Sequence, residues 1–355
     1  MVLTTKHHDG FCLWPSKYTE HSVKNSPCPV DVVKEAADAC RRGGIKFGFY
    51  LSPWDRNCSC YGTPEYNDYF CNQLTELLTQ YGEIFYVWFD NACGEGKNGK
   101  KQDYDFPRYF ELIHRYQPGA VIFNDFGSGP LAKEGSLSYL YNTENELGSM
   151  PNILYSKGLT FVPSEIDMSI RPGWFWHPDE EPHSLERLFH TYLKSCGANA
   201  CLNLNLPPDR DGLLDERDIK RLRELRALID RELGNELPAT IEKESGHGPT
   251  QPVYTITLDS PRDDIKYIVL KEDISKGQRV ESFRITAETD DEARSLNYPI
   301  YQGTCIGHKK ICMFKDPFAK PEVSPGSGSD AKIKKLKVHI TAARNEVIMK
   351  SISVF

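Results

Sequence analysis

One short run of the sequence constrains the fold of this chain more than any other. Residues 84–90 read Ile-Phe-Tyr-Val-Trp-Phe-Asp, an apolar and β-branched segment that ends in a carboxylate. Such a run is typical of a strand buried on both faces whose last residue emerges at an edge of the sheet. Asp90 would be partly desolvated there, so it is either held by hydrogen bonds or used in chemistry. The alternative is that Asp90 only begins the polar loop over residues 91–102.

Strand-like and helix-like segments alternate through the first two-thirds of the chain. We predict strands over residues 1–5, 45–51, 84–90, 120–124, 160–162 and 199–206, and helices over residues 30–42, 63–81, 106–116, 184–196 and 215–233. Gly43 and Gly44 end the first helix, Thr63 caps the second, and Asp215 with Asp218 opens the last. Strands separated by helices indicate parallel β/α units.

The predicted units favour a (β/α)8-type barrel followed by a second domain. A barrel of that type takes about 250 residues, and six strands are counted here, so we expect residues 1–237 to form a catalytic barrel without its first two β/α units. Beyond residue 238 the pattern changes to short alternating strands with no long helix. These are predicted over 253–258, 265–271, 279–286, 311–314, 335–341 and 346–355, and residues 238–355 are predicted to form an all-β sandwich.

Charge and hydropathy exclude several kinds of partner. The net charge of −7 includes no basic stripe for a phosphate backbone, so we expect no nucleic acid partner. No apolar run reaches the roughly 18 residues of a membrane-spanning helix, and no signal-peptide pattern opens the chain.

The 11 cysteines include Cys58 and Cys60 as well as Cys305 and Cys312, pairs that do not make a zinc site on their own. We therefore interpret most of the cysteines as small core residues or free thiols.

Polar and aromatic side chains cluster where the predicted strands end, which is where a β/α barrel carries its active site. They include His7, His8, Tyr50, Trp54, Trp88, Asp90, Glu134, Glu165, Asp167, Asn203 and Asn205. Aromatic faces stack on the apolar side of a pyranose, while His, Asn and Asp bind its hydroxyls. Because glycosidic cleavage requires a pair of carboxyl groups, this cluster indicates a glycosidase site.

Several longer strings carry a resemblance to one family. Residues 6–16, Lys-His-His-Asp-Gly-Phe-Cys-Leu-Trp-Pro-Ser, resemble a hallmark of the α-L-fucosidases of glycoside hydrolase family 29, and Trp88-Phe89-Asp90 lies where that family keeps its nucleophile motif. Residues 166–175 and 203–209 resemble the branch that prefers fucose linked α-1,3 or α-1,4 to branched glycans. Residues 272–280 resemble the family's β-sandwich, so the resemblance spans nearly the whole chain.

The resemblance implies a retaining mechanism and assigns roles by position. Asp90 would be the nucleophile, and Glu134 would be the acid/base, with Glu165 as the alternative and Glu144 and Glu146 behind it. A solvated loop carboxylate is the ordinary interpretation of each of these glutamates. The residues expected to bind fucose or line the leaving-group side are His7, His8, Tyr50, Trp54, Trp88, Asp167, Arg171 and Trp174.

The expected substrate is a fucosylated oligosaccharide or glycoconjugate, with no cofactor, no metal and no membrane partner. His7 and His8 are neighbours on a strand and point to opposite faces, so one metal ion seldom takes both. Three hypotheses stay open: an exo-acting α-L-fucosidase, a catalytically inactive or fucose-binding remnant of one, and a related barrel glycosidase that acts on another sugar. The resemblance alone suggests a secreted, periplasmic or lysosome-like compartment, and the oligomeric state is left open.

Overall fold

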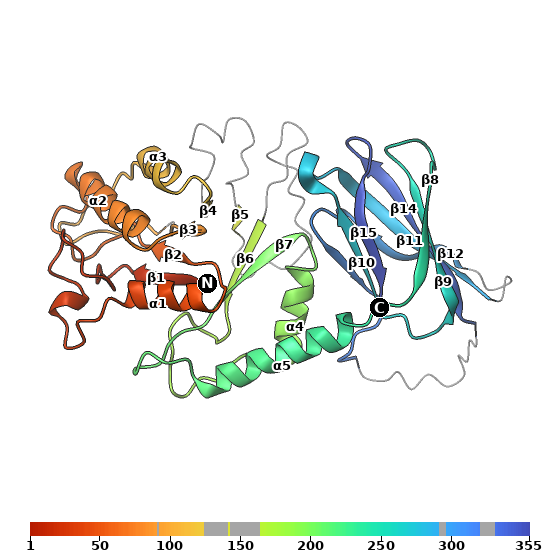
Figure 1. Cartoon of the computed structure of the whole chain (residues 1–355), viewed down its shortest axis with the longest axis horizontal. Coiled ribbons are helices and arrows are strands. Elements are labelled where there is room, and N and C mark those ends of the chain that lie inside the picture. The colour runs from red at the N-terminus through yellow and green to blue at the C-terminus, as the bar shows by residue number, and fades with distance from the viewer. Residues whose placement is uncertain (91, 124–140, 143–163, 291–295, 320–330) are drawn as a thin grey trace. The chain divides into compact units, whose positions relative to one another are not determined.

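The structure is a computed structural model that describes residues 1–90, 92–123, 141–142, 164–290, 296–319 and 331–355 (Figure 1). The chain divides into two compact units, Met1–Tyr141 and Asn142–Phe355. Among the described residues, every helix is too short or too polar to cross a membrane.

A four-stranded parallel sheet forms the centre of the first unit. Its order is β1 (Val2–Lys6), β2 (Gly48–Leu51), β3 (Tyr86–Trp88) and β4 (Val121–Phe123), the same as their order in the chain. Gly48 is required where β2 passes β3, because a Cβ atom there would lie 2.5 Å from the Tyr86 carbonyl oxygen. This close approach sets the register that places Tyr50 opposite Trp88.

Helices α1 (Val32–Arg42), α2 (Glu65–Gln80) and α3 (Phe106–Tyr116) follow β1, β2 and β3 in turn, and the short helix η1 (Val23–Asn25) precedes α1. Asp31 and Asp105 cap α1 and α3 with their carboxylates, whereas the residue before α2 is Pro64 and makes no side-chain cap. The prediction that Thr63 caps this helix is therefore wrong.

Successive side chains of each strand point to opposite faces of the sheet. Phe49 of β2 and Val87 of β3 join the buried cluster formed with α1, α2 and α3. Tyr50, Trp88 and Phe123 point the other way and form a second, smaller cluster. Since successive side chains of a strand alternate between faces, the helices cover only one side of this sheet.

The second unit begins with another α/β layer. Strands β6 (Ser164–Ser169) and β7 (Ala200–Asn205) pair in parallel within a sheet of order β5-β6-β7, where β5 is Tyr141–Asn142. Helices α4 (Leu185–Lys194) and α5 (Glu216–Leu233) begin at the caps Ser184 and Asp215. Both helices contribute leucines to a core that also contains Met168 and Ile170.

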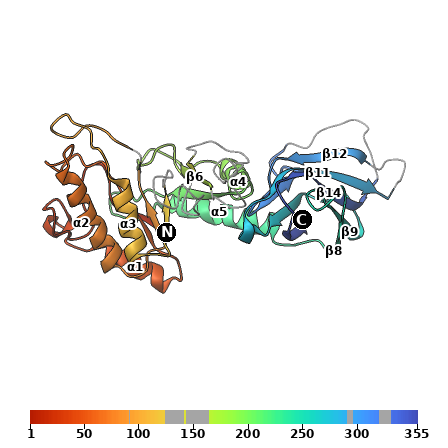
Figure 2. The same ribbon diagram turned by 90° about the horizontal axis from the view of Figure 1, so that it is seen from above.

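The rest of the second unit is made of antiparallel strands in two sheets around one apolar core. The larger sheet has the order β12-β11-β14-β9-β8, with β12 and β8 at its edges (Figure 2). Its strands are β8 (Ala239–Glu244), β9 (Val253–Arg262), β11 (Val280–Thr289), β12 (Leu296–Gly303) and β14 (Ile333–Ala343). The smaller sheet contains β13 (Lys310–Met313), β10 (Tyr267–Glu272) and β15 (Met349–Val354), and the short helix η3 (Ile274–Lys276) follows β10.

The main difference from the predicted elements concerns the segment before α4. The strand predicted over residues 160–162 lies outside the described residues, and the strand of this region is β6. Glu165 and Asp167 therefore lie inside a strand and are 3% and 8% exposed, so the interpretation of Glu165 as a solvated loop carboxylate is wrong. The sequence analysis also missed β8 and β12, and the strand expected over 84–90 is shorter, Tyr86–Trp88.

Candidate active site

Six of the predicted site residues meet at one edge of the sheet in the first unit. His7 and His8 directly follow β1, Trp54 follows β2, and Asp90 follows β3. The carboxyl ends of parallel strands lie at the same edge, which is why segments far apart in the chain converge there. Tyr50 and Trp88 belong to the strands themselves and lie on the face away from the helices.

Hydrogen bonds to both oxygens fix the Asp90 carboxylate. The Tyr50 hydroxyl donates to Oδ2 at 2.8 Å, and the Ala92 backbone N–H donates to Oδ1 at 2.8 Å. His8 Nε2 lies 3.7 Å from Oδ2, and the Asp90 side chain is 26% exposed. A carboxylate that is held in one orientation and is open to solvent can act as a nucleophile or a base.

Ser52 orients the imidazole of His8. The Ser52 hydroxyl donates to the Trp54 carbonyl oxygen at 2.8 Å and lies 2.7 Å from His8 Nδ1. Because the serine proton is used on the carbonyl, His8 Nδ1 is the donor in the second bond, and Nε2 of the neutral ring faces Asp90.

Burial lowers the pKa of both histidines. For His8 the neighbouring His7 lowers the pKa further, while Asp90 opposes the shift in both residues. The two rings lie 4.0 Å apart. The site therefore presents two neutral imidazoles at neutral pH, which suits hydrogen bonding to hydroxyl groups.

A row of aromatic rings runs beside the carboxylate. The Tyr50 ring stacks on Trp88 at 5.2 Å and on His7 at 5.6 Å, and Trp88 stacks on Phe123 at 4.3 Å. His8 and Trp54 lie 4.8 Å apart. An apolar ring surface next to polar groups is the arrangement that binds one face of a sugar.

A second loop holds Trp54 in place. The indole Nε1 donates to the Glu95 carbonyl oxygen at 3.2 Å, and a Cβ atom on Gly94 would lie 2.1 Å from the indole ring. A cavity of about 530 Å³ opens on the same loops, and its lining includes Arg56 and Glu95.

In the second unit, β6 and β7 carry a polar ladder. Asn203 donates to Glu165 Oε1 at 3.2 Å, and Asn205 donates to the Ser169 hydroxyl oxygen at 3.0 Å. Asp167 lies opposite Asn203 in the strand register. Asn203 and Asn205 are two positions apart on β7, and these bonds place their side chains on one face of the sheet.

Arg171 has an internal role in this unit. Its Nε donates to both carboxylate oxygens of Asp218, at 2.8 and 3.1 Å, and its NH2 group lies 3.0 Å from Asp215. Its NH1 group donates to two backbone carbonyls, and the residue is 1% exposed. Asp218 therefore pairs with Arg171, and the Asp215 carboxylate accepts from Arg217.

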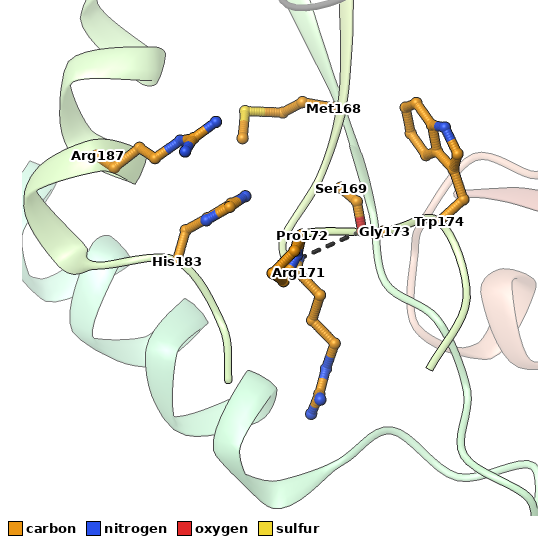
Figure 3. A pocket seen from close by; sticks show the side chains of 8 residues that line it. All are labelled: Met168, Ser169, Arg171, Pro172, Gly173, Trp174, His183 and Arg187. Carbon is orange, nitrogen blue, oxygen red and sulfur yellow. Dashed lines mark hydrogen bonds between the residues drawn. The ribbon is translucent and has the colours of Figure 1, made fainter. Parts of the chain in front are cut away.

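A cavity of about 240 Å³ lies beside the end of β6 (Figure 3). The side chains of His183 and Arg187 extend toward it, whereas the guanidinium of Arg171 points away (Figure 3). Trp174 stands at one side and is 41% exposed. Burial and the charge of Arg187 lower the pKa of His183.

The structure thus brings together His7, His8, Tyr50, Trp54, Trp88 and Asp90. Glu165, Asp167, Arg171 and Trp174 belong to the second unit, and Glu134, Glu144 and Glu146 lie outside the described residues. Phe123 was not predicted as a site residue, although it is the last residue of β4. That position was the available signal for it.

A family model described as Alpha-L-fucosidase matches residues 1–232. The chain is 38% identical to Alpha-L-fucosidase 1 of Arabidopsis thaliana over 356 residues, which are 88% of this chain and 70% of that protein.

Solved structures are similar over the whole chain. A Bacteroides ovatus protein is 37% identical with a TM-score of 0.76, and 100% of this chain aligns with 63% of that one. A glycoside hydrolase 29 family member from an unknown rumen bacterium is 34% identical with a TM-score of 0.80, covering 100% of this chain and 66% of that one. The chain therefore spans roughly two-thirds of the length of these relatives.

Proposed function

Because the chain belongs to the α-L-fucosidase family of glycoside hydrolases, we propose that it is an exo-acting α-L-fucosidase that removes terminal fucose from oligosaccharides or glycoconjugates. One observation carries the proposal beyond family membership. The carboxylate of Asp90, at the nucleophile position implied by the family motif, is oriented by Tyr50 beside two neutral histidines and a row of aromatic rings. This constellation provides a carboxylate, hydroxyl-binding groups and an apolar sugar platform together.

The reaction that we propose is a double displacement. Asp90 attacks the anomeric carbon of fucose and forms a covalent glycosyl ester, while a second carboxyl group donates its proton to the leaving oxygen. That group, now a carboxylate, takes a proton from water, and the water oxygen displaces Asp90. The configuration at the anomeric carbon is retained because it is inverted twice.

Glu134 is the proposed acid/base, on the family resemblance of the loop that contains it, and Glu165 is the alternative. The chemistry requires a carboxyl group about 5 to 5.5 Å from the nucleophile with a raised pKa. Glu165 has one feature in favour of such a role, because it is a buried carboxyl group at 3% exposure. Against it, Asn203 already donates a hydrogen bond to Glu165 Oε1.

The remaining site residues are proposed to contact two different parts of the substrate. His7, His8, Tyr50 and Trp88 are proposed to bind the fucose hydroxyls and ring. Trp54, Asp167, Arg171 and Trp174 are proposed for the leaving-group side, with Arg171 acting through the loop that it anchors. A preference for α-1,3 and α-1,4 linkages is part of the same proposal and rests on the resemblance of residues 166–175 and 203–209.

We also propose that residues 1–237 correspond to a (β/α)8-type catalytic barrel and residues 238–355 to a β-sandwich domain. Parallel strands alternate with helices from β1 to β4 and again from β6 to α5, and two antiparallel sheets share a core in the second range. Both features support this division.

Hydrolysis of aryl glycosides tests the activity directly. The chain should release nitrophenol from 4-nitrophenyl α-L-fucoside and not from the matching α- and β-galactosides, and it should remove fucose from α-1,3- and α-1,4-linked trisaccharides faster than from an α-1,2-linked one. Equal rates on the fucoside and the galactosides would contradict the proposed sugar, and a preference for the α-1,2 linkage would contradict only the proposed branch.

A further inference from the structure

The loop after β2 contains two cysteines whose sulfur atoms almost touch. Cys58 Sγ and Cys60 Sγ lie 2.7 Å apart. Non-bonded carbon atoms attract best at about 3.5 to 4.0 Å, and sulfur is a larger atom. The separation lies between that non-bonded distance and the roughly 2.05 Å of a covalent disulfide. The fold therefore places the two free thiols in direct contact.

The backbone explains why the pair is held so closely. The Tyr61 N–H donates to the Cys58 carbonyl oxygen at 3.3 Å, which closes a turn with Ser59 and Cys60 at its centre. The hydroxyl of Thr63 donates to the Cys60 carbonyl oxygen at 2.7 Å. Neither bond involves a sulfur, so the turn would bring both side chains to the same side in any redox state.

Both ends of this turn are anchored in the core. The Cys58 N–H donates to Asp55 Oδ1 at 2.8 Å, and the buried Asp55 carboxylate accepts from Lys6 Nζ at 3.2 Å. On the other side, the hydroxyl of the fully buried Tyr61 donates to the Gly94 carbonyl oxygen at 3.1 Å. A rigid frame lowers the conformational cost of joining the two sulfurs, and the loop closed by such a bond is short.

Solvent reaches the pair as well. Cys58 and Cys60 are half-buried and Ser59 between them is exposed, unlike the fully buried Cys12, Cys305 and Cys312. We propose that Cys58 and Cys60 form a reversible thiol–disulfide exchange site, which a low-molecular-weight disulfide oxidises and a low-molecular-weight thiol reduces. This site is distinct from the proposed catalytic residues and does not depend on the proposed fucosidase activity.

The exchange balances in two steps. The Cys58 thiolate attacks one sulfur of a disulfide RSSR and forms a mixed disulfide, Cys58–S–S–R. The other half leaves as RS⁻ and takes up the proton that Cys58 gave to water. Cys60 then loses its proton and attacks the Cys58 sulfur, and the second RS⁻ leaves and is protonated. Two thiols of the protein are oxidised, and one RSSR is reduced to two RSH.

The surroundings of Cys60 affect the ionisation of its thiol. Burial, together with the adjacent Cys58 thiol, raises the pKa of Cys60 to about 12, so this thiol stays protonated at neutral pH. Once Cys58 carries an RS group, it can no longer bear the negative charge that opposes ionisation of Cys60. The exchange can begin with Cys58 as the attacking residue, and the same balance of atoms and electrons holds when Cys60 attacks first.

Equilibration in glutathione buffers tests the proposal. The chain is incubated over a range of oxidised to reduced glutathione, quenched in acid and alkylated, and the Cys58–Cys60 bond is quantified by mass spectrometry of the peptide that contains both. We expect the bond to predominate in excess oxidised glutathione and to disappear in excess reduced glutathione. A pair that stays reduced throughout, or a bond from either residue to Cys93, would overturn the proposal.

Three variants sharpen the test. Cys60→Ser should accumulate glutathione on Cys58, and Cys58→Ser on Cys60, because each variant lacks the thiol that resolves the mixed disulfide. Cys28→Ser removes an exposed cysteine outside the turn and should leave the Cys58–Cys60 equilibrium unchanged. The absence of a glutathione adduct in both single variants would contradict exchange at this pair, and loss of the bond in Cys28→Ser would contradict an intramolecular pair.

Discussion

The hydroxyl of Tyr50 donates a hydrogen bond of 2.8 Å to the Oδ2 atom of Asp90. The two residues are 40 positions apart and meet because β2 and β3 are parallel neighbours that end at the same edge of the sheet. The bond fixes the direction of one carboxylate oxygen. It therefore links the fold of the first unit to the chemistry that we propose for Asp90.

Removal of this hydroxyl alone should slow the enzyme. Tyr50→Phe keeps the ring stack on Trp88 but loses a hydrogen bond to a charged group, worth about 1.5 to 3 kcal/mol, or roughly a 10- to 150-fold lower kcat/KM. The rate of 4-nitrophenyl α-L-fucoside hydrolysis measures the effect. Tyr116→Phe, at an exposed position of α3, is the matched control and should be silent. If the two variants behave alike, Tyr50 does not orient the nucleophile.

Because of His7 and His8, we expect the free energy of unfolding to fall in acid. Their pKa values lie below 6.5 in the folded chain because burial disfavours the charged imidazolium. As the pH falls below about 6.5, the unfolded chain takes up protons before the folded one does, so the free energy of unfolding falls with pH. Above that pH the contribution is fully present.

Urea denaturation at a series of pH values from 7.5 to about 5 checks this expectation. His183, His308 and His339 are shifted in the same direction and contribute in the same window. The double variant His7→Asn/His8→Asn should therefore retain part of the pH dependence and show a shallower slope than the parent chain. An identical slope would mean that the site histidines are not shifted.

Because Arg171 is buried, we expect its replacement to lower the free energy of unfolding more than it weakens substrate binding. Arg171→Met would leave the buried Asp218 without its cation, while Asp215 would keep Arg217. Breaking a buried pair costs about 3 to 5 kcal/mol. Urea denaturation should show a lower midpoint to match. Arg226→Met removes an arginine from an exposed ion pair with Asp230 and should leave the midpoint unchanged. A stable Arg171→Met protein with a raised KM would instead make Arg171 a direct binding residue.

Alanine substitutions can decide whether Glu134 or Glu165 is the acid/base residue. Replacement of the true acid by Ala should slow a natural glycan far more than a nitrophenyl fucoside, because a good leaving group needs little protonation. Azide should partly restore the rate of that variant by attacking the glycosyl ester, since a small anion needs no general base. We expect this pattern for Glu134→Ala. The same pattern in Glu165→Ala, and not in Glu134→Ala, would exchange the two roles.

The sequence contains most of what is needed to place the helices, because their ends are encoded locally. Asp31, Asp105, Ser184 and Asp215 accept hydrogen bonds from the first turns that they precede, and the helix predicted over residues 106–116 agrees in full with α3. Thr63 was a misleading signal, since Pro64 occupies the cap position of α2. Strands were harder, because β8 and β12 lie at sheet edges and alternate weakly.

The candidate site was predictable where residue type and strand position agreed. His7, Tyr50, Trp88 and Asp90 all lie at strand ends or on one strand face, and the structure brings them together. The internal role of Arg171 was not predictable, because its partner Asp218 is 47 residues away and looks in sequence like part of a helix cap. The sulfur contact between Cys58 and Cys60 depends on turn geometry that residue spacing alone does not specify.

The central claim is that Asp90 forms the covalent bond to fucose, and one comparison tests it most directly. Asp90→Asn preserves the size and the hydrogen-bonding shape of the side chain and removes its nucleophilic charge. We predict a fall in the turnover of 4-nitrophenyl α-L-fucoside of roughly 10⁴-fold or more, with an unchanged urea midpoint. Turnover by Asp90→Asn at the rate of the parent chain would contradict the account.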